Sequence, residues 1–80
     1  MKVTLLAFGI AKDITGQRFM DWELPEAASV GDLRAVLVER FPRMSELKSV
    51  RLAVNSEYAA EDSLLQENDE VALIPPVSGG

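Results

Sequence analysis

The residues that could carry chemistry stand at the end of the sequence, in the run Pro75-Pro76-Val77-Ser78-Gly79-Gly80. Proline cannot donate to a sheet ladder and holds an extended backbone, so the two prolines are expected to end a strand and begin a projecting arm. The residues after them are small or have no side chain, so the arm could enter a narrow slot and present a terminal carboxylate. The competing interpretation is a frayed chain end, as most chain ends are.

Composition removes most other kinds of chemistry. The 80 residues include no cysteine and no histidine, which leaves no thiolate nucleophile, no zinc thiolate and no imidazole to move protons near neutral pH. Eight Lys and Arg against 13 Asp and Glu give a net charge of −5. This balance argues against nucleic-acid binding, because such proteins need a basic surface. A self-contained active site is therefore not expected.

The apolar run near the start, residues 3–11 after Lys2, superficially resembles a short secretory leader. Lys12 and Asp13 end this run abruptly, so a buried first strand is the better interpretation. No run approaches the ~18 apolar residues of a membrane span. The sequence therefore favours a cytoplasmic protein with no membrane partner.

The arm needs a scaffold, and the hydrophobic pattern predicts one of the α+β class. Apolar or alternating runs predict strands, and a spacing of three and four predicts one main helix. In chain order these are a strand at 3–10 buried on both faces, a turn at 14–16, a strand at 17–24, a helix from 30 to 41, a strand at 50–54, a turn and edge segment at 55–58, an irregular stretch at 59–68 anchored by Leu64 and Leu65, and a central strand at 70–74. If the first and last strands lie parallel at the centre, this single domain, 1–80, is a β-grasp: a mixed sheet of about four or five strands on one helix, with a tail at 75–80.

The helix has the clearest local signals. Ser29 followed by Asp32 has the spacing of a capping box, and Pro42 is expected to stop the helix. One helix face carries Val30, Leu33, Leu37 and Phe41, and it is expected to cover Val3, Leu5, Phe19, Leu52 and Leu73 of the sheet. Phe8 is also expected in the core, while the position of Trp22 stays open.

Charge is spread unevenly along the chain. Residues 57–70 contain six acids and no base, whereas residues 34–51 contain five bases and two acids. The simpler interpretation is a solvated surface. The alternative is a docking surface that attracts a partner with a basic patch.

The last part of the chain resembles a known family. Residues 68–80, Asn-Asp-Glu-Val-Ala-Leu-Ile-Pro-Pro-Val-Ser-Gly-Gly, closely resemble the C-terminal signature of the small subunit of molybdopterin synthase, a family of ubiquitin-like sulfur carriers on a β-grasp fold. Residues 7–16 and 50–58 are similar to that family's first strand and turn and to its third strand. Lys12 stands where an arginine is common, and Asn68 where a glycine is usual. Asparagine also permits the positive φ that such a turn needs.

The resemblance implies a carrier function in molybdenum cofactor biosynthesis. A partner related to ubiquitin-activating enzymes would use ATP to adenylate the carboxylate of Gly80, and a sulfur donor protein would convert it to a thiocarboxylate. The carrier would dock on the large catalytic subunit of molybdopterin synthase, in a heterotetramer, and pass sulfur to cyclic pyranopterin monophosphate. The chain itself would bind no cofactor and no metal, and would be the non-catalytic subunit of that enzyme.

The resemblance also assigns roles to single residues. Gly80 would carry the sulfur, and the partner's active-site channel would receive Pro75, Pro76, Val77, Ser78 and Gly79; the alternative role of the prolines is to end the strand. Ile74 and Tyr58 would contact the large subunit through an apolar patch, or else belong to the core. Lys12 would pair with a partner acid, although an exposed lysine needs no partner.

Three other functions fit the same features. A sulfur carrier of the thiamine pathway would share the terminal diglycine. A ubiquitin-like modifier would join its last glycine to lysines of target proteins. A β-grasp interaction module would use its tail for neither purpose.

Overall fold

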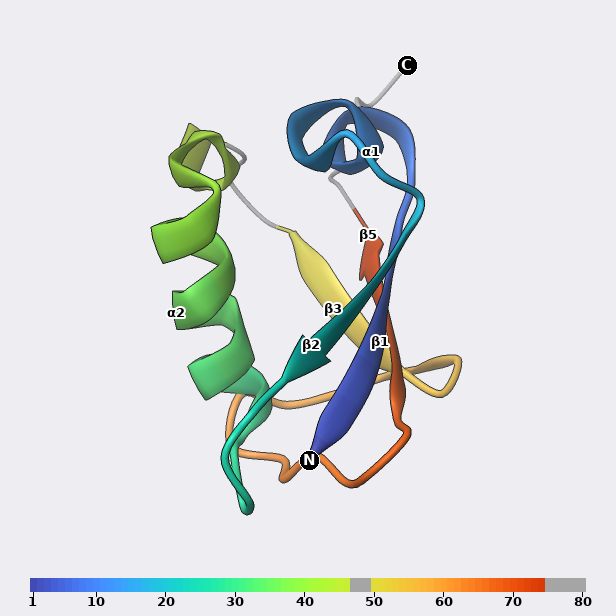
Figure 1. Cartoon of the computed structure of the whole chain (residues 1–80), viewed down its shortest axis with the longest axis vertical. Coiled ribbons are helices and arrows are strands. Elements are labelled where there is room, and N and C mark those ends of the chain that lie inside the picture. The colour runs from blue at the N-terminus through green and yellow to red at the C-terminus, as the bar shows by residue number, and fades with distance from the viewer. Residues whose placement is uncertain (47–49, 75–80) are drawn as a thin grey trace.

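The computed structural model describes residues 1–46 and 50–74 of the chain. In chain order its elements are β1 (Lys2–Ala7), α1 (Gly9–Thr15), β2 (Phe19–Glu23), α2 (Val30–Arg40), the 3₁₀ helix η1 (Pro42–Glu46), β3 (Arg51–Val54), β4 (Glu57–Tyr58) and β5 (Glu70–Ile74). The long helix α2 covers one face of the sheet, and the short helix α1 lies at the end where β5 finishes (Figure 1). Within these described parts, no helix has the length and apolar character that crossing a bilayer requires.

The sheet has the strand order β2-β1-β5-β3-β4. β1 runs parallel to β5, with Leu5 opposite Val71, and the other pairings are antiparallel. The first and last strands are therefore neighbours inside the sheet. This confirms the predicted α+β architecture of the β-grasp type, with β5 as a central strand.

The first strand is shorter than predicted, because α1 replaces its end and the predicted turn. Gly9 has a φ of +55°, a left-handed conformation that glycine adopts without strain and that ends the strand. α1 then closes on Gly16, whose φ is +77° and whose N–H donates to the carbonyl oxygen of Lys12 at 2.7 Å. The predictions of a strand continuing to Ile10 and of a turn at residues 14–16 are wrong.

β1 is also buried on one face only, not on both as predicted. Val3, Leu5 and Ala7 are fully buried, whereas the alternate residues are exposed or half-buried. Successive side chains of a strand point to opposite faces, and α2 covers only one of them. The other face of the sheet therefore stays open even at its central strands.

Helix α2 follows its sequence signals closely. The N–H of Asp32 donates to the Ser29 hydroxyl at 3.1 Å, and the N–H of Ser29 donates to the Asp32 carboxylate at 2.9 Å. This confirms the capping box, which satisfies two backbone donors at the helix start. Val30, Leu33 and Leu37 are buried as predicted, and the helix ends before Pro42.

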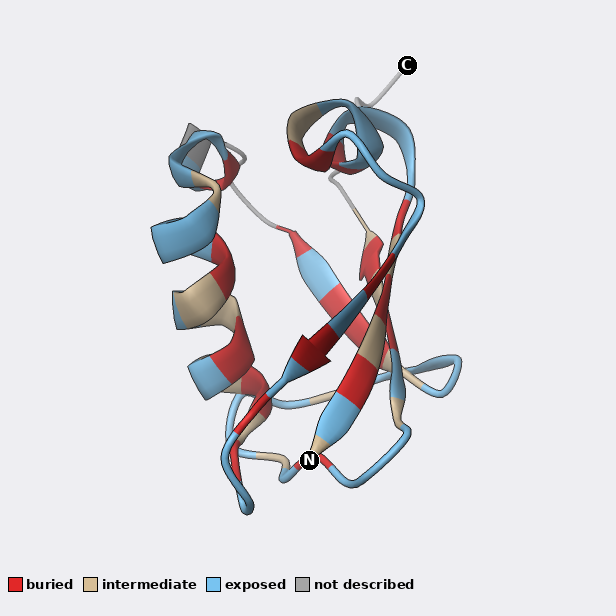
Figure 2. Ribbon diagram, in the orientation of Figure 1, coloured by how far each residue is buried: buried red, intermediate tan, exposed pale blue. Residues whose placement is uncertain are grey.

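The core lies between α2 and the sheet (Figure 2). Its largest fully buried side chains are Leu5, Leu33, Leu52, Leu73, Val3, Val30 and Val71. Trp22, which the sequence left open, is buried and stacks on Phe41 with 6.2 Å between ring centroids. The Arg40 guanidinium lies 5.0 Å from the centre of the Trp22 ring, so two residues at the end of α2 contact the indole of β2.

Two phenylalanines predicted in the core lie outside it. Phe19 is 64% exposed and Phe8 is 40% exposed. Met20 and Trp22 take the two core positions of β2, so alternation turns Phe19 to the opposite face. Leu65 anchors the loop at residues 59–68 as predicted, but Leu64 is exposed.

Two turns use left-handed backbone at non-glycine residues. Asn55 and Ser56 both have positive φ, +50° and +74°, which is the geometry of a two-residue hairpin turn between β3 and β4. Asn68, just before β5, has a φ of +67°, as its replacement of a glycine led us to expect.

Candidate functional site

The candidate site begins where β5 ends. Ile74 is paired with Arg51 of β3, and its neighbour Leu73 is paired with Ala7 of β1. The segment carrying Pro75, Pro76, Val77, Ser78, Gly79 and Gly80 lies outside the described residues. The chain therefore passes into the candidate functional segment from between two strands, beside α1, and not from an edge of the sheet.

The open face of the sheet carries a continuous apolar row next to this point. Strand register places one residue of each strand in line, Phe19-Leu6-Ala72-Ala53-Tyr58 in the order of the strands, and we call this set the apolar row. Phe19 and Tyr58 are exposed at its two ends, Leu6 and Ala72 are half-buried between them, and Ala53 is buried beside Tyr58. An exposed apolar patch of this kind is typical of a protein-binding surface.

Ile74 lies on the same open face, two residues along β5 from Ala72, and is half-buried. Tyr58 is 64% exposed, so neither residue belongs to the core. Their placement fits the predicted apolar patch, and contact with a partner remains a prediction. Lys12 is exposed in the last turn of α1, and α1 lies at the end of the sheet where β5 finishes (Figure 1).

Two arginines near the end of β5 were not predicted from the sequence as residues of the candidate site. The Arg18 guanidinium lies 5.3 Å from the centre of the Phe8 ring, and the Arg51 guanidinium lies 5.1 Å from the centre of the Tyr58 ring. Stacking on a ring face lets each arginine keep its charge while covering an exposed aromatic. Together with Lys12 of α1, they place three cations near the end of β5, with the exposed acid Asp13 beside Lys12.

Acidic residues gather at the opposite end of β5, and several make local hydrogen bonds. The Asp69 carboxylate accepts from the Asn55 side-chain amide at 3.0 Å and from the Gln66 N–H at 2.8 Å. Glu67 accepts from the N–H of Lys2 at 3.1 Å. These contacts support a structural role for part of the acidic run at residues 57–70, while its docking role stays a prediction.

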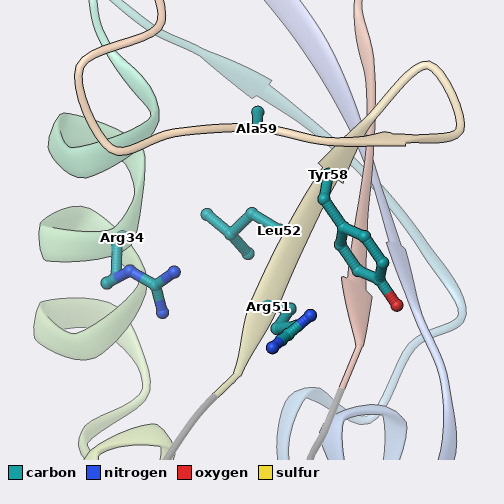
Figure 3. A pocket seen from close by; sticks show the side chains of 5 residues that line it. All are labelled: Arg34, Arg51, Leu52, Tyr58 and Ala59. Atoms are coloured by element: carbon teal, nitrogen blue, oxygen red, sulfur yellow. The ribbon is translucent and has the colours of Figure 1, made fainter.

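A shallow pocket of about 380 Å³ opens beside the Tyr58 end of the row (Figure 3). Its lining residues are Arg34, Arg51, Leu52, Tyr58 and Ala59. On the helix side, Arg34 donates from Nε to Glu61 at 2.7 Å and from Nη1 to the carbonyl oxygen of Val50 at 2.6 Å. Arg34 thus ties the loop after β4 and the start of β3 to α2, so its charge is used within the fold.

We expect Arg34→Met to lower the free energy of unfolding by about 1–2 kcal/mol, because one partly exposed ion pair is lost and the Val50 carbonyl loses its charged donor. Urea denaturation measures this difference. Arg43→Met, at an exposed position of η1, is the control and should change stability by less than about 0.5 kcal/mol. Equal effects of the two substitutions would show that the Arg34 contacts do not stabilise the fold.

The chain is similar to known proteins over nearly its whole length. Residues 5–80 match the ThiS family. The molybdopterin synthase sulfur carrier subunit of Dictyostelium discoideum is 40% identical over 95% of this chain and 93% of its own length. The corresponding subunit of Arabidopsis thaliana is 35% identical over 100% of this chain and 84% of its own.

Solved structures with the same fold include two relevant proteins. SAMP1 of Haloferax volcanii, a small archaeal modifier protein, superposes with a TM-score of 0.86 at 28% identity, over the whole of both chains. A chain from the complex of subunits 1 and 2 of the molybdopterin-converting factor of Helicobacter pylori superposes with a TM-score of 0.70 at 27% identity, also over the whole of both chains. From the family match and from relatives aligned over almost their full length, the chain belongs to the ThiS family of ubiquitin-like β-grasp proteins.

Proposed function

We propose that this protein is the sulfur-carrier subunit of a molybdopterin synthase and that the carboxylate of Gly80 carries the sulfur. The observation that carries the proposal is the alignment, over nearly full length, with relatives named for that function. The open face and the central position of β5 support it, because they put a protein-binding surface beside the start of the segment that would be delivered.

The chemistry needs no side chain of this chain. A terminal carboxylate has a pKa of about 3.5, so near neutral pH it is an anion and a poor electrophile. Adenylation by a ubiquitin-activating-enzyme-like adenylyltransferase would join it to AMP, with pyrophosphate leaving. Sulfide, released from a persulfide on a donor protein by a thiol reductant that is oxidised to a disulfide, would then attack the carbonyl carbon as AMP leaves, producing the thiocarboxylate at Gly80.

Delivery of the sulfur depends on how the chain docks on the large subunit and on how far the segment after Ile74 can reach. The apolar row, with Ile74 beside it, would contact the large catalytic subunit, and Lys12 would face an acid of a partner. Six residues follow Ile74, and a fully extended segment of that length spans at most about 20 Å. The partner's reacting site would therefore lie within about 20 Å of the docked sheet, along a channel narrow enough to need Gly79.

Structural similarity to SAMP1 supports a second candidate, a ubiquitin-like protein modifier. Activation would be the same, but a lysine amine of a target protein, not sulfur, would attack the adenylated Gly80. The two functions therefore differ in the nucleophile and in the product.

Reconstitution with purified components tests the proposal. The chain is loaded with ATP, an activating enzyme and a sulfur source, and is then mixed with the large subunit and cyclic pyranopterin monophosphate. We expect molybdopterin to form while the thiocarboxylate is consumed, and no product from chain that was not loaded. Conjugates of higher mass in a lysate, without molybdopterin, would favour the modifier. A loaded chain that supports only thiamine synthesis would favour the thiamine pathway.

A further inference from the structure

The outer edge of β2 offers backbone hydrogen-bonding groups beyond those that pair with β1. Leu24 and Met1 exchange hydrogen bonds of 2.8 and 2.7 Å, and Ala7 donates to the carbonyl oxygen of Arg18 at 2.8 Å. The backbone groups of an antiparallel strand alternate in direction, so Phe19, Asp21 and Glu23 direct their N–H and C=O groups away from β1. β2 is the last strand on this side of the described sheet.

A groove lies next to the β2 edge, on the face of the sheet that α2 covers. A hollow of about 580 Å³ lies between the segment after β2 and α2, and its lining is mainly apolar, with Leu24, Pro25, Ala27, Ala28, Ala35 and Val36 beside two acids. A second hollow continues along α2 and shares Val36 with the first. A strand added to β2 would point every second side chain towards this groove.

The edge and its groove are rich in carboxylates. Asp21 and Glu23 are exposed on β2, Glu26 and Asp32 line the first hollow, and Glu39 lines the second. The N-terminal ammonium lies 3.7 Å from both Glu23 and Glu26, and the Asp21 carboxylate accepts from the Thr4 hydroxyl at 2.9 Å. Arg40 is the cation of the second hollow, and it covers Trp22. Against these carboxylates stand the N-terminal ammonium, Arg40 and the exposed Lys2, which is paired with Glu23 in the strand register. The acids still outnumber these cations, so the surface is complementary to positive charge.

We propose that the β2 edge binds an extended segment of a partner protein that alternates apolar and cationic residues. Its backbone would pair with Phe19, Asp21 and Glu23, its apolar side chains would enter the groove, and its cations would lie opposite Asp21 and Glu23. Strand addition extends the sheet sideways, so it leaves most of the apolar row and the end of β5 uncovered. This site is separate from the proposed delivery of sulfur and does not depend on it.

Charge also argues against a second copy of the chain as the occupant. Asp21 is the central residue of the five-residue strand β2. Two copies paired antiparallel about this centre would place Asp21 directly opposite Asp21 of the other copy, and like charges directly opposite destabilise a strand pair. Charged edge residues commonly prevent such self-pairing.

An NMR titration of the labelled full chain tests the proposal. The probe is the capped peptide acetyl-Lys-Val-Lys-Val-Lys-Val-Lys-amide, and the matched control has Glu in place of each Lys. We expect saturable shifts of the Phe19, Asp21, Glu23 and Val36 amide signals, with affinity for the control peptide at least tenfold lower. Shifts centred on Leu6, Ala72 and Tyr58, or no shifts, would overturn the proposal. Shifts of β2 signals that depend on protein concentration alone would identify a second copy and would also overturn it.

Two variants separate backbone pairing from charge. Asp21→Pro removes an outward N–H that β1 does not use, so the fold should survive and peptide binding should be lost. If that variant does not fold, Asp21→Lys tests the charge alone and should weaken peptide binding at least tenfold. Retention of wild-type affinity by a folded Asp21→Pro variant, or by Asp21→Lys, would contradict the proposal.

Discussion

A chain that ends at Ser78 is expected to fold as stably as the full chain and to support no cofactor synthesis. The deletion removes Gly79 and Gly80, which follow the described residues in the sequence, so no described contact of the core is lost. The new terminal carboxylate falls short of the old position by two residues, at most about 7 Å in an extended chain. The measurement is molybdenum cofactor synthesis in a strain that lacks its own small subunit, where activity should fall to the level of that strain.

The full-length chain, expressed at the same level in the same strain, is the control. The thermal unfolding midpoints of the two proteins should agree. Gly79→Ala is the finer variant, because it keeps the terminal carboxylate and adds only one methyl group. We expect it to unfold normally and to support less cofactor synthesis than the full chain, since the methyl group would clash in the proposed channel of the partner. Cofactor synthesis by the chain that ends at Ser78 would contradict the proposed role of the last two residues.

The second large effect is expected at the centre of the apolar row. Ala72→Asp places a carboxylate where the large subunit would exclude water, and an unpaired buried charge costs about 3 kcal/mol or more. The dissociation constant for the large subunit should therefore rise at least about a hundredfold. In the free chain the new side chain faces solvent, so stability should fall by no more than about 1 kcal/mol. Calorimetric titration of the two purified subunits measures the binding change.

Val38→Asp is the matched control for this substitution. It adds the same charge at an exposed position of α2, the helix that covers the other face of the sheet. Its affinity for the large subunit should stay within about twofold of the unmodified chain, a difference below 0.5 kcal/mol. Equal weakening by the two variants would indicate a general effect of charge and would remove the open face from the proposed interface.

Local signals in this sequence predicted local structure well. The capping box of Ser29 and Asp32 and the apolar positions of α2 depend on residues three or four apart, and both are present as predicted. The secondary structure of the apolar run at the start was harder to predict, because a short apolar run fits a buried strand and a helix segment equally well. Gly9 marks the boundary between β1 and α1, but its positive φ is a property of the folded chain.

The candidate site was predicted only in part, because it combines residues from all five strands. Tyr58 and Ile74 were predicted to lie on an apolar patch, and the structure places both on the open face. Phe19 and Leu6 were missed because their face depends on strand register, which pairs residues far apart in the sequence. The one available signal was that Phe19 alternates with Met20 and Trp22 along the strand, which would have placed Phe19 on the face opposite to these two residues. No sequence signal pointed to Arg18 and Arg51, because only the folded chain brings each of them onto an aromatic ring, Phe8 for Arg18 and Tyr58 for Arg51.

The most direct test of the central claim is the location of the sulfur atom. The chain is incubated with ATP, its activating enzyme and a sulfur source, and the product is fragmented in a mass spectrometer. We predict a gain equal to one sulfur replacing one oxygen, confined to the fragment whose last residue is Gly80. Sulfur on any other fragment, or an unchanged mass after complete activation, would contradict the account.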